Sequence, residues 1–201
     1  MAWTKTQTVI VVGVAVLAVL AMVGGIKIVQ KSRAVGIKAF GLKIHISLAP
    51  DETLVTGGWQ VEAGQRVFVF ITPTWIDPAG RHLQAPQGAQ PEVVITAHIL
   101  EAPEQDMEKL GLKSLFVTQN DTNVSEKYTP AQMKPLMATF KAHGKDRLST
   151  SSMVTLAGRQ IQIDIQKLLP GGSSIDLLPT VSSDGISVDL TGAVQIVQAT
   201  K

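Results

Sequence analysis

Apolar and polar residues alternate in two stretches of the second half of the chain, at residues 161–166 and 186–191. Alternation with a period of two is typical of a strand with one buried face and one solvated face. Ala157-Gly158 and Ser183-Asp184-Gly185 stand just before these stretches and suit tight turns that need a positive φ. The pattern therefore predicts two β-hairpins between residues 148 and 191.

The first half of the soluble part also alternates and predicts more strands. Residues 42–48 place Leu and Ile against Lys, His and Ser, and residues 54–61 form a second candidate strand interrupted by Gly57-Gly58. Residues 66–72 contain the run VFVFI and follow a four-residue loop that includes a glycine. Two such strands joined by a short loop predict a further hairpin.

Two helices are expected between these groups of strands. Thr129, Pro130 and Gln132 match a helix start with a capping box, which predicts a helix from Thr129 to Gly144. Its apolar face would hold Met133, Leu136, Met137 and Phe140. Pro135 lies inside this span and would kink the helix or move its start. A second, short acidic helix is expected within residues 93–112, after a strand.

The N-terminal part carries no charge from residue 6 to residue 26 and is almost entirely apolar from Val9 onward. About 20 apolar residues cross the hydrocarbon core of a membrane as a helix, which predicts a membrane anchor within residues 1–33. A cleaved signal peptide is the alternative, although the apolar run is long for one. Lys27, Lys31 and Arg33 follow the run, and the positive-inside rule would keep the domain in the cytoplasm.

Composition adds little chemistry. The net charge is +2, cysteine is absent, and the basic residues are scattered, which argues against nucleic-acid binding. The chain has no HExxH, GxSxG, GxxxxGK[ST] or GxGxxG motif. His45, His82, His98 and His143 show no ligand spacing. We therefore expect no catalytic, cofactor-binding or metal-binding residues, and we expect that the protein is not an enzyme.

Four segments in order resemble the start of the secretin domain of bacterial secretion systems and type IV pili. They are VVITAHILEAPEQDMEKLGL, TPAQMKPLMATFKAHG, LSTSSMVTLAGRQIQIDI and IDLLPTVSSDGISVDL, which lie within residues 92–191. The resemblance implies a secretin-like domain at residues 92–201 that faces the periplasm of a bacterium. A full secretin domain continues through further barrel strands, so the likeness covers only a truncated part of one.

These observations predict an α+β fold: an N-terminal transmembrane helix, then β-hairpins and two helices in a secretin-like mixed domain. The expected divisions are a membrane anchor (1–33), a β subdomain (34–78), a linker loop (79–91) and the secretin-like domain (92–201). The expected location is the bacterial inner membrane, crossed once.

The expected function is a membrane-anchored, non-catalytic interaction or assembly module. It would form homo-oligomers or join a larger envelope assembly by pairing strands. The uncharged residues Gln160, Gln162, Gln166, Ser187 and Thr191 would mark the edges that pair. In the alternative, the first hairpins at residues 42–71 or the helix after Thr129 cover these edges and the protein stays monomeric. A membrane-bound sensor and a periplasmic hydrolase are the alternatives.

Overall fold

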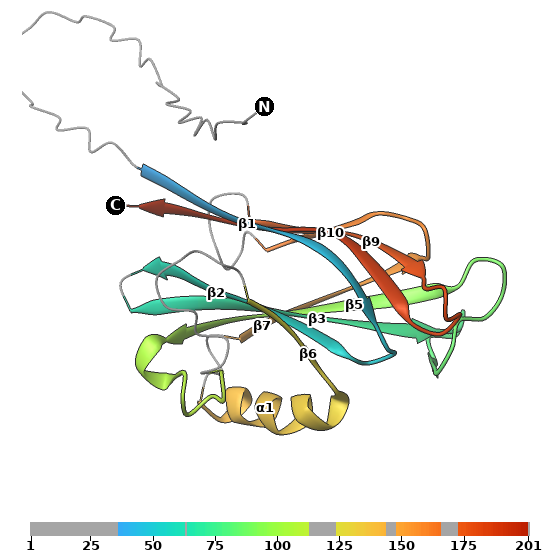
Figure 1. The fold of residues 1–201 in the computed structure, drawn as a ribbon, viewed down its shortest axis with the longest axis horizontal. Helices are drawn as coiled ribbons and strands as arrows, with labels where there is room; N and C mark the ends of the chain where they lie inside the picture. The colour runs from blue at the N-terminus through green and yellow to red at the C-terminus, as the bar shows by residue number, and fades with distance from the viewer. Residues whose placement is uncertain (1–35, 63, 113–123, 144–147, 166–172, 201) are drawn as a thin grey trace, which may run out of the picture. The chain divides into compact units, whose positions relative to one another are not determined.

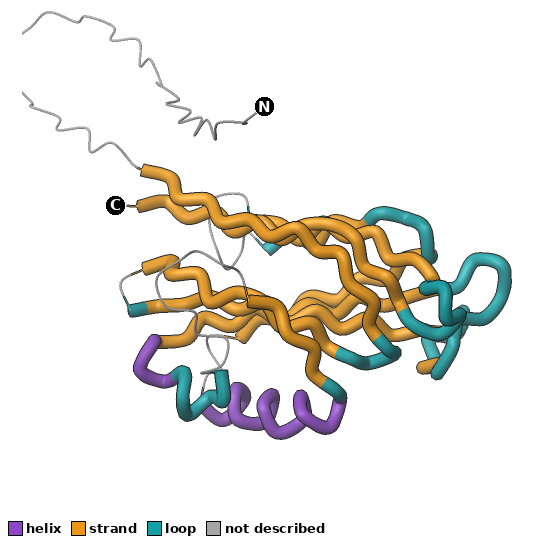
Figure 2. The backbone as a smooth tube through the Cα atoms, in the orientation of Figure 1, coloured by secondary structure: helices purple, strands orange, loops and turns teal. Residues whose placement is uncertain are grey.

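A computed structural model describes residues 36–62, 64–112, 124–143, 148–165 and 173–200. Residues Ala34–Lys201 form one compact unit. Within this unit, two antiparallel β-sheets pack face to face, and a helix covers the far side of one of them (Figure 1; Figure 2). The segment expected to enter the membrane, residues 1–33, lies outside the described residues.

The first sheet, called sheet A here, has four strands in the order β1-β10-β9-β8. Their bounds are β1 (Gly36–Leu48), β10 (Val188–Thr200), β9 (Ser174–Val181) and β8 (Ile161–Asp164). The two long strands β1 and β10 pair along their whole length, from Gly36 opposite Thr200 to Leu48 opposite Val188. β1 therefore forms one edge of sheet A, and β10 is an interior strand.

The second sheet, sheet B, runs in the order β6-β2-β3-β5-β7. Its strands are β6 (Val124–Tyr128), β2 (Thr53–Glu62), β3 (Gln65–Ile76), β5 (Glu92–Pro103) and β7 (Leu148–Leu156). The two-residue strand β4 (His82–Leu83) pairs with the end of β3. β3 and β5 pair over twelve residues, so the loop expected to separate two domains joins neighbouring strands of one sheet.

The run VFVFI is apolar throughout because β3 is buried on both faces. Val67, Val69 and Ile71 join the core between the two sheets, whereas Phe68 and Phe70 belong to a second core on the opposite face. All five side chains are fully buried. Burying a side chain of this size stabilises a protein by about 1.5–3 kcal/mol relative to its exposure, so β3 contributes more than any half-buried strand of equal length.

The second core lies between sheet B and the helix α1 (Pro130–His143). Met133 and Phe140 are buried there, with Leu136 and Met137 partly buried beside them, so the predicted apolar face is confirmed. The ring of Phe140 lies 5.3 Å from the ring of Phe70, measured between centroids. The helix therefore covers only part of the outer face of sheet B.

The helix start is also as predicted. The backbone N–H of Thr129 donates to Gln132 Oε1 at 2.9 Å, and the backbone N–H of Gln132 lies 3.4 Å from Thr129 Oγ1. These two contacts are the reciprocal bonds of a capping box. Pro135 lies inside the helix, which continues past it.

The expected second helix is wrong. β5 stays extended as far as Pro103, and only Glu104–Asp106 follow as a single 3-10 turn, η1. Gly111, at φ 69°, then ends the segment. Three helical residues are too few for an α-helix. In so short a segment, the backbone N–H and C=O groups at the two ends have no hydrogen-bond partner within the helix.

The expected pair of hairpins is half right. β9 and β10 form a hairpin, with Val181 opposite Val188, and Ile186 lies in its turn rather than in the strand. β7 and β8, by contrast, belong to different sheets: β7 pairs with β5, and β8 pairs with β9. The Ala157-Gly158 turn therefore carries the chain from sheet B to sheet A.

The expected fold class must be corrected as a whole. The described residues form two antiparallel sheets with one α-helix, and not an α+β domain of hairpins and two helices. The expected transmembrane helix falls outside these residues. Among the residues that the structure describes, no helix is long and apolar enough to span a membrane.

Candidate functional site

Polar side chains gather where the β1–β2 turn meets the β3–β4 region. Asp51, in the β1–β2 turn, accepts a hydrogen bond from the hydroxyl of Thr74 at 2.7 Å through Oδ1. Its other oxygen, Oδ2, lies 2.7 Å from Nε2 of His82. Asp51 also has a positive φ of 64°, which a non-glycine residue adopts uncommonly. One carboxylate thus links three segments of the chain.

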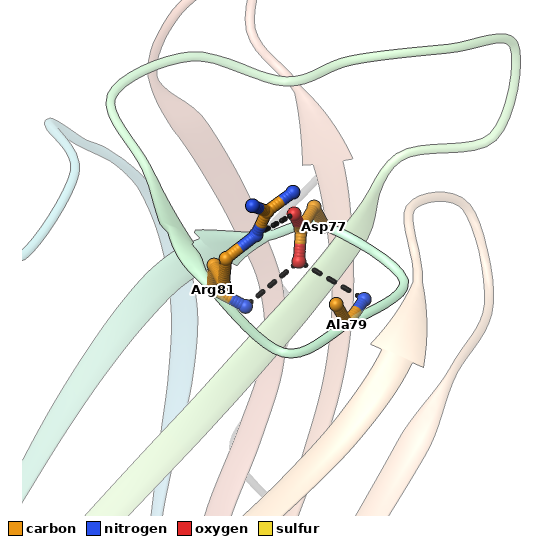
Figure 3. A network of polar contacts seen from close by, with 3 residues as sticks. All are labelled: Asp77, Ala79 and Arg81. Carbon is orange, nitrogen blue, oxygen red and sulfur yellow. Dashed lines mark hydrogen bonds and ion pairs between the residues drawn. The ribbon is translucent and has the colours of Figure 1, made fainter.

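The loop that follows β3 is organised around Asp77 (Figure 3). Its carboxylate accepts hydrogen bonds from the backbone N–H groups of Ala79 at 3.0 Å and Arg81 at 2.8 Å, and from Arg81 Nε at 2.6 Å. The backbone N–H of Arg81 is the main reason why the pKa of Asp77 lies below its ordinary value of 3.8. Because every one of these bonds is local, the carboxylate serves the turn itself.

The arrangement around His82 does not match a nucleophilic triad. In such a triad the carboxylate and the attacking hydroxyl bind opposite nitrogens of the imidazole. Here the hydroxyl of Thr74 donates to Asp51 and not to His82. The side chain of His82 is also 43% exposed, so water competes for the hydrogen bonds of its ring. These contacts tie β3, β4 and the β1–β2 turn together.

Two of the other histidines have structural partners. Nδ1 of His45 lies 3.2 Å from the hydroxyl of Thr191 on the neighbouring strand. Nδ1 of His98 lies 2.7 Å from the hydroxyl of Thr150, and burial, helped by the positive charge of Lys141, lowers the pKa of His98 below 6.5. His143 is the last residue of α1. Within the described ranges, no three His, Cys, Asp or Glu residues group closely enough to hold a metal ion.

The most distinctive surface feature is the edge of sheet B formed by β7. β7 pairs with β5 along all nine of its residues, Leu148 to Leu156. No strand among the described residues pairs with its other side. Met153 is 37% exposed and Val154 is 56% exposed, so each face of the sheet has one exposed apolar side chain at this edge. An edge of this kind presents backbone donors and acceptors to a partner strand.

The other edges are shorter or carry charge. β6 has five residues, including Glu126 and Lys127, and β8 has four. β1 is long but includes an exposed lysine, Lys43. Short edge strands and lysines discourage pairing between sheets. The segment LSTSSMVTL of β7 has neither charge nor proline, so it is the best suited of the four to receive a partner strand.

A row of hydroxyl side chains crosses the outer face of sheet B and ends at the middle of β7. The hydroxyls of Thr53 and Thr72 are 2.7 Å apart, and those of Thr96 and Ser152 are 3.1 Å apart. Thr72 and Thr96 are directly opposite each other on β3 and β5. The row fixes the side chain of Ser152 against the sheet from one side only.

None of the residues expected to mark the pairing edges lies on β7. Thr191 lies on β10, which has β1 on one side and β9 on the other, and Ser187 bonds within the β9–β10 turn. Gln162 is on the short strand β8, Gln160 precedes it, and Gln166 lies outside the described residues. An early strand, β1, does pair with β10 along its whole length, so this side of the C-terminal hairpin is covered. The absence of charge in residues 148–156 is the sequence feature that points to β7 as a pairing edge. The expected hairpin with residues 161–165 assigns a different partner to this strand and so conceals the edge.

Comparison with protein-family models, with curated proteins and with solved structures finds no match to this chain. The secretin resemblance therefore gains no support from relatives. What the chain does must be inferred from its own edges and polar groups.

Proposed function

We propose that this protein is a non-catalytic interaction module that receives a partner strand along β7. The observation that carries the proposal is the combination of length, composition and exposure at this edge. Nine consecutive residues without charge or proline are paired on one side by β5, and two adjacent apolar side chains are exposed among them. Addition of a strand to such an edge satisfies its backbone groups and buries alternate side chains.

Attachment to a membrane is a second part of the proposal and rests on the sequence of residues 6–26. An uncharged apolar segment of that length favours the hydrocarbon core over water. Extraction of membranes with alkaline carbonate should leave the full-length protein in the pellet. Recovery of a shortened protein in the soluble fraction would mean that the segment is a cleaved signal.

The competing function is hydrolysis, which only the contact between His82 and Asp51 favours. Its geometry places the nearest hydroxyl on the carboxylate, so we propose a structural role for the pair. Generic esterase, peptidase and glycosidase substrates should show no turnover that depends on His82. Turnover that disappears in the His82→Ala variant while the fold persists would replace the interaction proposal with an enzymatic one.

The proposal is tested on the full chain in its native membranes by chemical cross-linking. Val154→Lys introduces a charge at the β7 edge and should abolish the cross-linked assembly. Ile186→Lys is the matched control, because Ile186 is 50% exposed, apolar and located in the β9–β10 turn. An assembly that survives Val154→Lys unchanged, or that is lost equally in both variants, would show that β7 is not the binding edge.

A further inference from the structure

We infer that the strand received by β7 is the β7 strand of a second copy of this chain, in antiparallel orientation and centred on Ser152. The inference rests on the proposed function and identifies its partner. Sheet B would then continue across a two-fold axis, with β7 of each copy between its own β5 and the β7 of the other copy.

The residues of β7 fix this register. In an antiparallel pair, residues directly opposite each other lie on the same face of the sheet. With Ser152 opposite its own symmetry mate, all nine residues from Leu148 to Leu156 find a partner. Moving the axis to Ser151 or Met153 leaves residues at the ends of the strand unpaired. The centred register therefore forms the most backbone hydrogen bonds, about eight to ten in total, which is the number found in a typical stable interface.

The side chains that meet in this register are compatible. Leu148 would face Leu156, Ser149 would face Thr155, Thr150 would face Val154, and Ser151 would face Met153, each on the other copy. No pair brings charges together, and the strand contains none to repel its copy. The exposed side chains of Met153 and Val154 would each be covered by a neighbour across the axis.

Self-pairing is favoured over a foreign partner because the pattern of β7 is self-complementary. Its two leucines are the first and last residues, so reversal of the strand places leucine on leucine. The hydroxyl row also ends at Ser152, the residue on the axis, so the row of one copy would continue into the row of the other. A β1 edge would offer no such match, since exposed Lys43 would have to be accommodated.

Disulfide cross-linking tests the register directly, because the chain contains no cysteine. Opposite residues of an antiparallel pair have Cα atoms about 4.5–5.5 Å apart, within the range that a disulfide spans. The full chain carrying Ser152→Cys, purified in detergent and oxidised, should form a covalent dimer. Ser183→Cys, exposed in the β9–β10 turn, is the matched control and should form no covalent dimer.

A charge exchange provides a second measurement that does not depend on oxidation. Ser152→Lys places two lysines on the axis and should raise the dissociation constant of the dimer by about fivefold or more, and Ser152→Glu should do the same. A mixture of the two variants pairs lysine with glutamate and should restore the wild-type value. Light scattering on the detergent-solubilised chain measures all three.

The outcomes separate the identity of the partner from the proposed function. A chain that stays monomeric in detergent, whose Ser152→Cys variant cross-links in membranes to a different protein, overturns self-pairing and leaves β7 as the binding edge. A dimer that is unaffected by Ser152→Lys overturns the β7 register and places the contact elsewhere. Failure of Ser152→Cys to cross-link to anything, in detergent or in membranes, overturns both proposals.

Discussion

Gly57 lies at an irregularity in the pairing of β2, and residues of β2 before and after it point into the same core. The register between β2 and β3 shifts between Gly57 and Trp59, which forms a bulge. Leu54 before the bulge and Trp59 after it both reach the core between the sheets, although they are five positions apart. Regular alternation would send one of them to the opposite face, so the extra residue preserves the core.

We predict that Gly57→Ala lowers the free energy of unfolding by about 2 kcal/mol or more. Gly57 has a φ of 131°, and a Cβ atom there would lie 2.5 Å from the carbonyl oxygen of Val67 and 2.7 Å from the Cα of Phe68. Gly64→Ala is the control, because Gly64 also has a positive φ but nothing lies within 4 Å of its added Cβ. The control should cost about 1 kcal/mol, measured by urea unfolding. Equal losses would show that backbone conformation, and not the close approach, decides.

His98 gives the stability of the protein a dependence on pH. Its pKa in the folded protein lies below 6.5 because burial, and then Lys141, disfavours the charged ring. The unfolded chain therefore takes up a proton more readily, and the stability associated with neutral His98 is lost as the pH falls below 6.5. We predict that His98→Gln reduces the loss of stability between pH 6.5 and about pH 5.

The measurement is chemical unfolding of wild type and variant at both pH values, with the difference between the two proteins taken at each pH. Lys141→Met should reduce the same dependence by a smaller amount, because the lysine is the lesser cause. His45→Gln is a control on an exposed strand position. A pH dependence identical in wild type and His98→Gln would show that other groups control it.

At the scale of elements, α1 and the β7–β8 connection show what local sequence can and cannot predict. The start of α1 follows from Thr129 and Gln132, which bond to each other, and its buried face follows from spacing alone. Ala157-Gly158 suits a hairpin equally well, yet the strands on either side join different sheets. That choice depends on the pairing of β7 with β5 and of β8 with β9, and local turn chemistry contains no information about it.

Local sequence is equally unable to predict most of the candidate site. The unpaired edge at β7 and the link between Asp51 and His82 are products of tertiary structure, since each needs residues from separate strands. By contrast, the absence of charge in residues 148–156 is visible in the sequence itself. The composition of residues 148–156 therefore identifies a strand suited to pairing, but only the position of β7 in sheet B makes it an edge.

Pro135 is the least favourable residue of α1, and we predict that Pro135→Ala raises the free energy of unfolding by about 2 kcal/mol. Proline inside a helix costs about 3 kcal/mol relative to alanine, and part of this is offset because proline also restricts the unfolded chain. Pro135 is exposed, so the change leaves the second core intact. Lys134→Ala, one residue earlier and also exposed, should change stability very little. Urea unfolding compares the two, and a loss of stability in Pro135→Ala would mean that the helix needs its proline.

At the scale of the whole molecule, the two sheets should unfold as one unit. The core between them draws residues from strands on both sides, and Trp75 Nε1 of sheet B donates to the carbonyl oxygen of Ile186 in the β9–β10 turn at 2.7 Å. β1, from the first part of the chain, is completed by β10 from the last. Neither half of the sequence contains a full sheet.

We therefore predict that cutting the chain at an engineered protease site within residues 87–90 leaves the two fragments associated. These residues are exposed, so a site there should be accessible. Once separated in denaturant, neither fragment should regain cooperative unfolding alone, because each lacks the strands that its own would pair with. Circular dichroism of the isolated fragments during thermal unfolding measures this. A sharp transition in either fragment would support the expected division at residues 79–91.

The pairing of β1 with β10 also has a consequence for biosynthesis. His45 and Thr191, which meet across these strands, are 146 positions apart in the chain. At the usual speed of translation, roughly 7–30 s pass between the synthesis of a strand and that of a partner so far away. During this interval β1 has no ladder to join and exposes Leu42, Ile44 and Ile46 to the cell. Nascent chains of this protein should therefore depend on chaperones until β10 emerges from the ribosome, and sheet A should be the last part of the fold to form.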